Sequence, residues 1–285
     1  MYDRILVGYD GSQPSNAALV EALNWARSDK GSVSMVHAVF FDSEEFSISP
    51  SQLDERIGKG KDVCLVASKR YSSEFGVDIP CDVLQGEPHD VIPDQADKLK
   101  ANLIALGTYG RKGLRRMIMG SVTAGVISHS PCDVLVVKKP CTECTGTYKS
   151  ILVPFDGSDT AKRAVESAAE LASRMSASLT LLYVIPRYEE MIGFIKTETI
   201  REKLYDEARR IVQDGEAIAK SKGVSANTMV EEGSPTGRIL EMAGGLGSDL
   251  IVMGHRGWSG MDKAIIGSTA ERVITHCNVP VLVVR

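Results

Sequence analysis

The chain lacks the features that mark membrane-spanning, exported and nucleic-acid-binding proteins. It has no uninterrupted apolar run of about 18 residues, which a membrane-spanning helix needs. Its first residues, MYDRILVGYDGS, enter an apolar stretch without the charged and then apolar segments of an export signal. Its 33 basic and 37 acidic residues leave a formal net charge of -4, which favours neither nucleic acid nor a membrane surface as a partner. We therefore expect a cytoplasmic protein.

Cysteine is sparse, with six residues among 285. A chain of this length and ordinary apolar content needs no disulfide framework, and this usage is typical of reduced intracellular proteins. We expect four of the cysteines to fill core positions as thiols: Cys64, Cys81, Cys132 and Cys277.

The usual phosphate-binding fingerprints and catalytic constellations are also missing. No G-x-x-x-x-G-K-[ST] loop and no G-x-G-x-x-G follows an expected strand. The five histidines form neither a metal-ligand pair nor part of a Ser-His-acid set. Only His255 lies near the glycine motif described next, so the sequence predicts no catalytic residue.

What the chain does have is a three-glycine motif that occurs twice with the same spacing. Each glycine of the first motif recurs 147 residues later, and a serine follows both motifs. The first motif consists of Gly107, Gly110 and Gly120 before Ser121, and the second of Gly254, Gly257 and Gly267 before Ser268.

The repetition extends over nearly the whole chain. ILVGYDGS at residues 5–12 is matched by ILVPFDGS at residues 151–158, and LIALGTYG is matched by LIVMGHRG. Because internal repeats decide the architecture, we divide the chain into two copies of one unit. The first domain covers residues 1–139, a linker covers 140–148, and the second domain covers 149–285.

Within each copy, short apolar runs alternate with stretches of helical periodicity. In the second copy a long helix is expected from Thr197 to Lys222, with later strands near Ala226–Val230, Leu250–Met253 and Val281–Val284. Alternating strands and helices predict an α/β fold with a parallel sheet covered by helices on both faces. We expect two tandem doubly wound domains, each with five strands.

An aspartate follows the first expected strand of each copy. Asp10 and Asp156 would lie at the carboxyl edge of the sheet, where open α/β folds bind ligands, and a carboxylate there can accept hydrogen bonds from a ribose. Asp-Gly-Ser is equally an ordinary turn and helix cap. Both interpretations stay open.

The glycine motif follows the fourth expected strand and ends in Gly-Ser before a helix. Glycine allows main chain to approach a ligand, and the amides at a helix start attract phosphate. A glycine turn with an ordinary serine cap is the alternative, but a motif repeated with intact spacing favours phosphate binding. The expected amides are those of Gly120, Ser121 and Val122, and of Gly267, Ser268 and Thr269.

Cys141 and Cys144 lie in the linker with the spacing of half a zinc site or of a redox pair. No second ligand pair lies nearby, and no thioredoxin-like strand precedes them. A redox-responsive or metal-responsive adaptor built on these two cysteines remains an alternative function.

Taken together, D-G-S after the first strand and G-x-x-G-x9-G-[ST] after the fourth resemble the universal stress protein family in its tandem, ATP-binding form. The resemblance implies sheet order 3-2-1-4-5 in each domain, an adenine nucleotide alpha hydrolase-like fold, with ATP across strands one and four. That position is where the strand order reverses.

The resemblance also implies roles for individual residues. Asp10 and Asp156 would contact the adenosine part, the main chain of Ala38 and Val184 the adenine, and Leu106 or Met253 would line the base. The ribose and phosphates would be held in the first domain by Gly107, Gly110, Gly120, Ser121 and Val122, and in the second by Gly254, Gly257, Gly267, Ser268 and Thr269.

The two copies match the family pattern unequally. Gly8 and Asp133 stand where the family often has proline, whereas Pro154 and Pro280 keep it in the second copy. The second copy therefore matches better, and equal occupancy of the two sites is not implied.

The expected function is a nucleotide-dependent stress-response module that binds its nucleotide in one or both repeats, with little or no hydrolysis. Its ligand would be ATP, with ADP or AMP as alternatives and Mg²⁺ accompanying ATP. An ATP-using hydrolase or ligase on a related α/β fold is the competing hypothesis. The resemblance further implies an intrachain pseudo-dimer formed by the two VLVV strands, a further homodimer and a protein partner of unknown identity.

Overall fold

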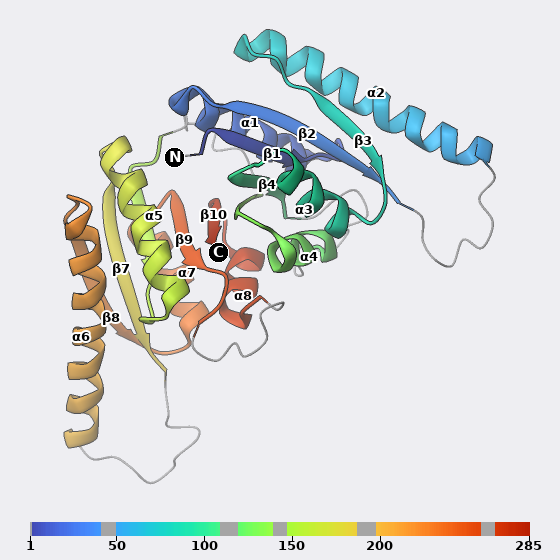
Figure 1. Ribbon diagram of the computed structural model, residues 1–285. Helices are drawn as coiled ribbons and strands as arrows, with labels where there is room; N and C mark the ends of the chain where they lie inside the picture. Colours follow the sequence, from blue (N-terminus) through green and yellow to red (C-terminus); the bar gives the residue numbers. More distant parts are fainter. Residues whose placement is uncertain (1, 41–49, 109–118, 139–146, 187–197, 258–265) are drawn as a thin grey trace. The chain divides into compact units, whose positions relative to one another are not determined.

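The computed structural model describes residues 2–40, 50–108, 119–138, 147–186, 198–257 and 266–285 (Figure 1). The chain divides into two compact units, Met1–Gly146 and Thr147–Arg285. We call them repeat 1 and repeat 2 and treat each by itself.

Repeat 1 contains five parallel strands and four helices within the described residues. Its sheet has the order β3-β2-β1-β4-β5. Along the chain the elements are β1 (Arg4–Gly8), α1 (Gln13–Asp29), β2 (Ser32–Val39), α2 (Pro50–Phe75), β3 (Cys81–Gln85), α3 (Pro88–Lys98), β4 (Leu103–Gly107), α4 (Ser121–His129) and β5 (Asp133–Val137).

Repeat 2 has the same topology, with the order β8-β7-β6-β9-β10 and parallel strands. The predicted order 3-2-1-4-5 is therefore confirmed in both repeats. The elements are β6 (Ser150–Pro154), α5 (Asp159–Met175), β7 (Ser178–Ile185), α6 (Glu198–Ser221), β8 (Ala226–Glu232), α7 (Pro235–Gly245), β9 (Leu250–Gly254), α8 (Ser268–His276) and β10 (Val281–Val284).

The central strands are buried along their length because helices cover both faces of each sheet. All five residues of β9 are buried, as are the first four of β4. A strand buried on both faces reads as a continuous apolar run. This explains why LIAL and LIVM show no alternation of polar and apolar residues.

Two glycines show which helices cover which face of repeat 1. A Cβ at Gly8 would point at Ile92 of α3, whereas a Cβ at Gly107 would point at Pro14 of α1. On the α3 side, α3 packs against α4. On the α1 side, α2 is joined to α1 by a hydrogen bond from Tyr71 Oη to Asn16 Oδ1. Figure 1 shows α2 running alongside β3.

The turn from the first strand into the first helix is built alike in both repeats. Gly11 and Gly157 have φ of 77° and 82°, which glycine adopts without steric cost. Ser12 and Ser158 then cap α1 and α5, and each hydroxyl accepts a hydrogen bond of 3.3 Å from a first-turn amide. The same Asp-Gly-Ser tripeptide thus ends a strand and starts a helix twice.

One cysteine prediction is wrong. Cys64 of α2 and Cys81 at the start of β3 form a disulfide, with a Cα–Cα distance of 5.8 Å, instead of lying apart as core thiols. Their separation of 17 residues indicates nothing from sequence, because only the packing of α2 on β3 brings them together. Cys132 and Cys277 keep thiols, half-buried and buried respectively. Cys141 and Cys144 lie outside the described residues.

Among the helices that the structure describes, none is both long and apolar enough to cross a bilayer.

Candidate functional site

The candidate site of each repeat lies where the strand order reverses. β1 pairs with β2 on one side and β4 on the other, and β6 pairs with β7 and β9 in the same way. Connections that leave two neighbouring parallel strands in opposite directions open a crevice at their carboxyl ends. The predicted aspartates follow β1 and β6 at this edge, and the glycine motifs begin at the ends of β4 and β9.

Each aspartate is oriented by its own turn. Asp10 Oδ1 accepts a hydrogen bond of 2.9 Å from the amide of Ser12, and Asp156 Oδ1 accepts one of 3.0 Å from the amide of Ser158. This is the geometry of an Asx turn, so the ordinary turn role of Asp-Gly-Ser is present in both repeats. The same hydrogen bond holds each carboxylate at the carboxyl edge of the sheet.

In repeat 2 the aspartate and the glycine motif come together. A Cβ built at Gly257 would overlap Asp156 Oδ2. The carboxylate therefore lies directly against the main chain of the loop that follows β9, and any side chain at position 257 displaces it. The corresponding residue of repeat 1, Gly110, lies outside the described residues.

The first glycine of each motif has a packing role that its sequence pattern does not indicate. A Cβ at Gly107 would lie 2.7 Å from the carbonyl carbon of Pro14, and one at Gly254 would lie 2.9 Å from that of Thr160. Both neighbours belong to the first turn of the helix after the aspartate. The absence of a side chain lets this helix start approach the end of the fourth strand of its repeat.

The third glycine of each motif precedes a helix. Gly120 and Gly267 are the N-caps of α4 and α8, with ψ of 140° in both, and neither has a side chain to bond the first-turn amides. Their own amides donate to the carbonyls of Thr108 and His255 at 3.0 and 2.8 Å. The amides that follow stand at the positive end of the helix dipole. They belong to Ser121 and Val122 in repeat 1 and to Ser268 and Thr269 in repeat 2.

The residues assigned to the base lie on the strands that end at this edge of the sheet. Ala38 and Val184 are half-buried near the ends of β2 and β7, while Leu106 and Met253 are buried in β4 and β9. Leu106 also explains why glycine replaces the common proline at position 8, because Leu106 Cδ2 would lie 2.5 Å from a Cβ there. The leucine occupies the space above that glycine.

Thr160 is a site residue that sequence reasoning missed. It is buried, and its hydroxyl donates a hydrogen bond to the carbonyl of Arg256 in the glycine loop. It thereby joins the start of α5 to the loop that contacts Asp156. A threonine in the first turn of a helix is too common to signal such a contact, so no sequence pattern would have identified it.

The comparisons with known proteins decide the family. The chain matches Usp, the Universal stress protein family, over residues 1–138 and 147–285. The chain belongs to the universal stress protein family. It matches a universal stress protein of Methanocaldococcus jannaschii with 36% identity over 141 residues, covering 48% of this chain and 82% of the relative. Universal stress protein YxiE of Bacillus subtilis is 32% identical over 147 residues, with 48% and 99% covered.

A crystal structure extends the likeness to the whole chain. A universal stress protein from Archaeoglobus fulgidus superposes with a TM-score of 0.74 and 20% identity, covering 100% of this chain and 99% of the other. At that identity the likeness concerns the fold. The universal stress protein fold therefore accounts for both repeats.

His255 distinguishes repeat 2 from repeat 1 of this universal stress protein. It follows β9, is only 4% exposed, and lies 3.2 Å through Nδ1 from the carbonyl oxygen of Val284. A carbonyl only accepts, so Nδ1 carries the proton and Nε2 is an acceptor, without a partner among the described residues. Burial lowers the pKa of His255 to about 4, and the positive charges of Arg285, Arg256 and Arg163 act in the same direction. The imidazole is therefore neutral at pH 7.

The buried, neutral His255 should make the folded chain less stable at acid pH. The pKa of His255 is about 4 in the folded chain and has its ordinary value of 6.5 in the unfolded chain. Between these pH values the unfolded chain therefore binds one more proton than the folded chain. The contribution of His255 to the free energy of unfolding is therefore complete above pH 6.5 and is lost as the pH falls to 4. The loss is roughly 3 kcal/mol, at 1.36 kcal/mol per pH unit.

Urea unfolding at pH 7.5 and pH 4.5 measures this effect. His255→Thr, which introduces the residue that repeat 1 has at Thr108, should lose less stability between the two pH values than the parent chain. An identical loss in both proteins would show that His255 does not contribute.

Within the described residues, no group of three His, Cys, Asp or Glu side chains is placed to hold a metal ion. The carboxyl edge of each sheet offers an oriented carboxylate, helix-start amides and closely packed main chain. These groups suit a ligand that carries both hydroxyls and phosphate.

Proposed function

We propose that this chain is a nucleotide-dependent regulatory module that binds ATP or another adenine nucleotide at the crevice of each repeat. The observation that carries the proposal is the approach of Asp156 to Gly257 in repeat 2. It joins a hydrogen-bond acceptor for ribose hydroxyls to the loop that leads into α8. Such a pair spans the two chemically different ends of a nucleotide.

Each part of the nucleotide has a matching group in the proposed site. The carboxylates of Asp10 and Asp156, oriented by serine amides, would accept hydrogen bonds from the ribose. The starts of α4 and α8, capped by glycine, would receive the phosphates. The half-buried Ala38 and Val184 would contact the adenine through main chain. Where Mg²⁺ accompanies ATP, we expect phosphate oxygens and several waters to be among its ligands.

We propose that hydrolysis is slow or absent. The one histidine beside the glycine motif is buried, neutral and bonded through Nδ1 to a main-chain carbonyl. Asp10 and Asp156 are each bonded to the turn that follows them, which favours a binding role over proton transfer. The bound nucleotide would therefore act by changing the chain's shape or its partners.

Removing the carboxylate charge tests the assignment directly. We expect Asp156→Asn and Asp10→Asn each to weaken ATP binding in its own repeat by about 10-fold, because hydrogen bonds to a charged group contribute about 1.5 to 3 kcal/mol. Isothermal titration of protein freed of copurified nucleotide measures both sites. Asp206→Asn on the exposed face of α6 is the matched control and should bind as the parent does.

The same variants separate binding from catalysis. Binding in the parent that is unchanged in both aspartate variants would contradict the proposed site. ATP turnover in the parent that collapses in these variants would instead favour the hydrolase hypothesis.

A further inference from the structure

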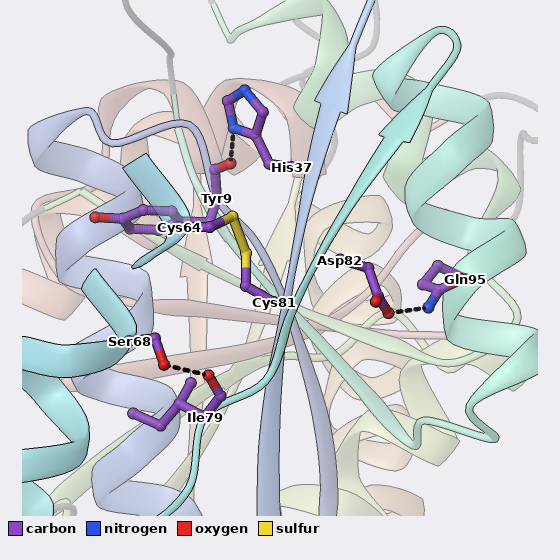
Figure 2. The surroundings of a disulfide bond; sticks show 8 residues. All are labelled: Tyr9, His37, Cys64, Ser68, Ile79, Cys81, Asp82 and Gln95. Atoms are coloured by element: carbon purple, nitrogen blue, oxygen red, sulfur yellow. Dashed lines mark hydrogen bonds between the residues drawn. A yellow bond between two sulfur atoms is a disulfide. The ribbon is translucent and has the colours of Figure 1, made fainter. Parts of the chain in front are cut away.

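One face of α2 is buried and carries the disulfide. Its buried residues are Gly60, Cys64, Ala67 and Tyr71, which recur at helical spacing and form a single stripe. Cys64 bonds to Cys81, the first residue of β3 (Figure 2). The disulfide thus joins the middle of this stripe covalently to the strand at one end of the repeat 1 sheet.

The buried stripe of α2 packs against His37, which is hydrogen-bonded to the residue before Asp10. A Cβ at Gly60 would lie 2.8 Å from His37 Cδ2 and 3.1 Å from Val83 Cγ1, so α2 packs closely over β2 and β3 here. His37 Nδ1 in turn donates a hydrogen bond of 2.7 Å to the carbonyl of Tyr9, which Figure 2 shows beside the disulfide. Tyr9 immediately precedes Asp10.

A second connection reaches the same turn through Asn16. Tyr71 Oη and Tyr9 Oη both donate to Asn16 Oδ1, at 3.2 and 2.9 Å. Asn16 Nδ2 donates to the carbonyl of Ser12 at 2.8 Å. The segment from Tyr9 to Ser12, which contains Asp10, is therefore connected to the α2 stripe at both of its ends.

Repeat 2 lacks the residues of the disulfide and of the Asn16 connection. Phe155 replaces Tyr9 and has no hydroxyl, and Lys162 replaces Asn16. Thr228 lies opposite Leu181 of β7 as Cys81 lies opposite Met35 of β2, so the cysteine position holds threonine. Repeat 2 is thus an internal control for any property that depends on the disulfide.

We propose that Cys64 and Cys81 form a thiol–disulfide switch that sets how firmly the Asp10 turn is held. Through that turn it sets the nucleotide affinity of repeat 1 but not of repeat 2, and this part rests on the proposed function. In the oxidised state the disulfide holds α2 against β3 and keeps the His37 and Asn16 connections in place. In the reduced state α2 separates more readily from β3, and the turn is less well ordered.

The reducing partner is a dithiol. One of its thiolates attacks Cys81 Sγ and forms a mixed disulfide, while Cys64 Sγ leaves with the bonding electrons and takes a proton. The second thiol of the reductant then attacks the mixed disulfide and releases Cys81 as a thiol. Two electrons and two protons pass to the protein, and the reductant becomes a disulfide. We take Cys81 as the residue that is attacked, since it is half-buried on β3, whereas Cys64 is buried.

Hydrogen exchange with mass spectrometry tests the switch. The chain is compared after air oxidation and after treatment with dithiothreitol, with alkylation and mass confirming the state of the two cysteines. We expect reduction to speed exchange in β3 and in Tyr9–Ser12 by about 10-fold, because local opening controls exchange. The matching segment Phe155–Ser158 should not change. Equal exchange of Tyr9–Ser12 in both states, or a disulfide that does not re-form on reoxidation, overturns the proposal.

Two variants and one ligand complete the test. A chain with Cys64→Ala and Cys81→Ala should show the fast exchange with or without oxidant, while Cys132→Ala should switch as the parent does. Isothermal titration with ATP should show weaker binding to repeat 1 after reduction. The affinity should fall by about 3-fold to 10-fold, which corresponds to about 1 kcal/mol of binding free energy. If exchange responds but ATP binds in neither state, the switch stands and the proposed function fails. If ATP binds but neither affinity nor exchange responds, the switch fails alone.

Discussion

Gly257→Ala is expected to weaken ATP binding in repeat 2 by about 100-fold while leaving the chain folded. The added methyl group overlaps Asp156 Oδ2, so the carboxylate must rotate away and lose its orientation towards the proposed ribose position. Hydrogen bonds to charged groups contribute about 1.5 to 3 kcal/mol each. The same methyl group also hinders the approach of a ligand to the main chain of the loop. The atom displaced is the end of a side chain, so little folding stability is lost.

Isothermal titration and thermal unfolding together measure this result. Gly244→Ala is the matched control, because this glycine lies in α7 of the same repeat and a Cβ there meets nothing within 4 Å. The control should bind ATP like the parent. Two undiminished binding sites in Gly257→Ala would show that the contact between Asp156 and the loop has no role in binding.

Gly107→Ala is expected to destabilise repeat 1 itself. Its Cβ would lie 2.7 Å from the carbonyl carbon of Pro14 and 2.9 Å from the amide nitrogen of Ser15. Main chain in a helix start cannot rotate away as a side chain can, so α1 must shift relative to β4. Forcing an extra carbon into packed structure costs about 1 to 3 kcal/mol, and we expect the upper part of that range.

Urea unfolding followed by circular dichroism measures the loss. Gly58→Ala in α2 serves as the control, because a Cβ there meets nothing within 4 Å. Alanine is the better helix former, so this control should equal or exceed the parent in stability. If Gly107→Ala unfolds at the same urea concentration as the control, the close approach of α1 to β4 is not required.

The architecture was predictable because its signals are repeated and local. Apolar runs, helical periodicity and two copies of Asp-Gly-Ser indicated the strands and helices, and the family resemblance implied their order. The strands expected near residues 226–230, 250–253 and 281–284 correspond to β8, β9 and β10. The cytoplasmic location, the pairing of the VLVV strands and a further homodimer stay predictions.

The packing roles within the site were not predictable, because they depend on contacts between distant segments. Gly107 and Gly254 resembled ligand-binding glycines, yet each also admits a helix start to the end of a strand. The bond from Thr160 to the Arg256 carbonyl follows from the same close approach. A glycine retained for packing and one retained for a ligand look identical in sequence.

The structure explains the differences between the two repeats by particular residues. Gly8 accommodates Leu106, whereas the second repeat has proline at the equivalent position, Pro154. The disulfide and the Asn16 hydrogen bonds belong to repeat 1. The buried neutral imidazole of His255 belongs to repeat 2. One topology therefore surrounds two candidate sites with different residues.

Native mass spectrometry of the nucleotide-free chain titrated with ATP tests the central claim most directly. We predict species that carry one and then two ATP molecules per chain, with the second species reduced in Asp156→Asn and reduced further in Gly257→Ala at an ATP concentration that just saturates the parent. A parent chain that carries no nucleotide at saturating ATP would contradict the account.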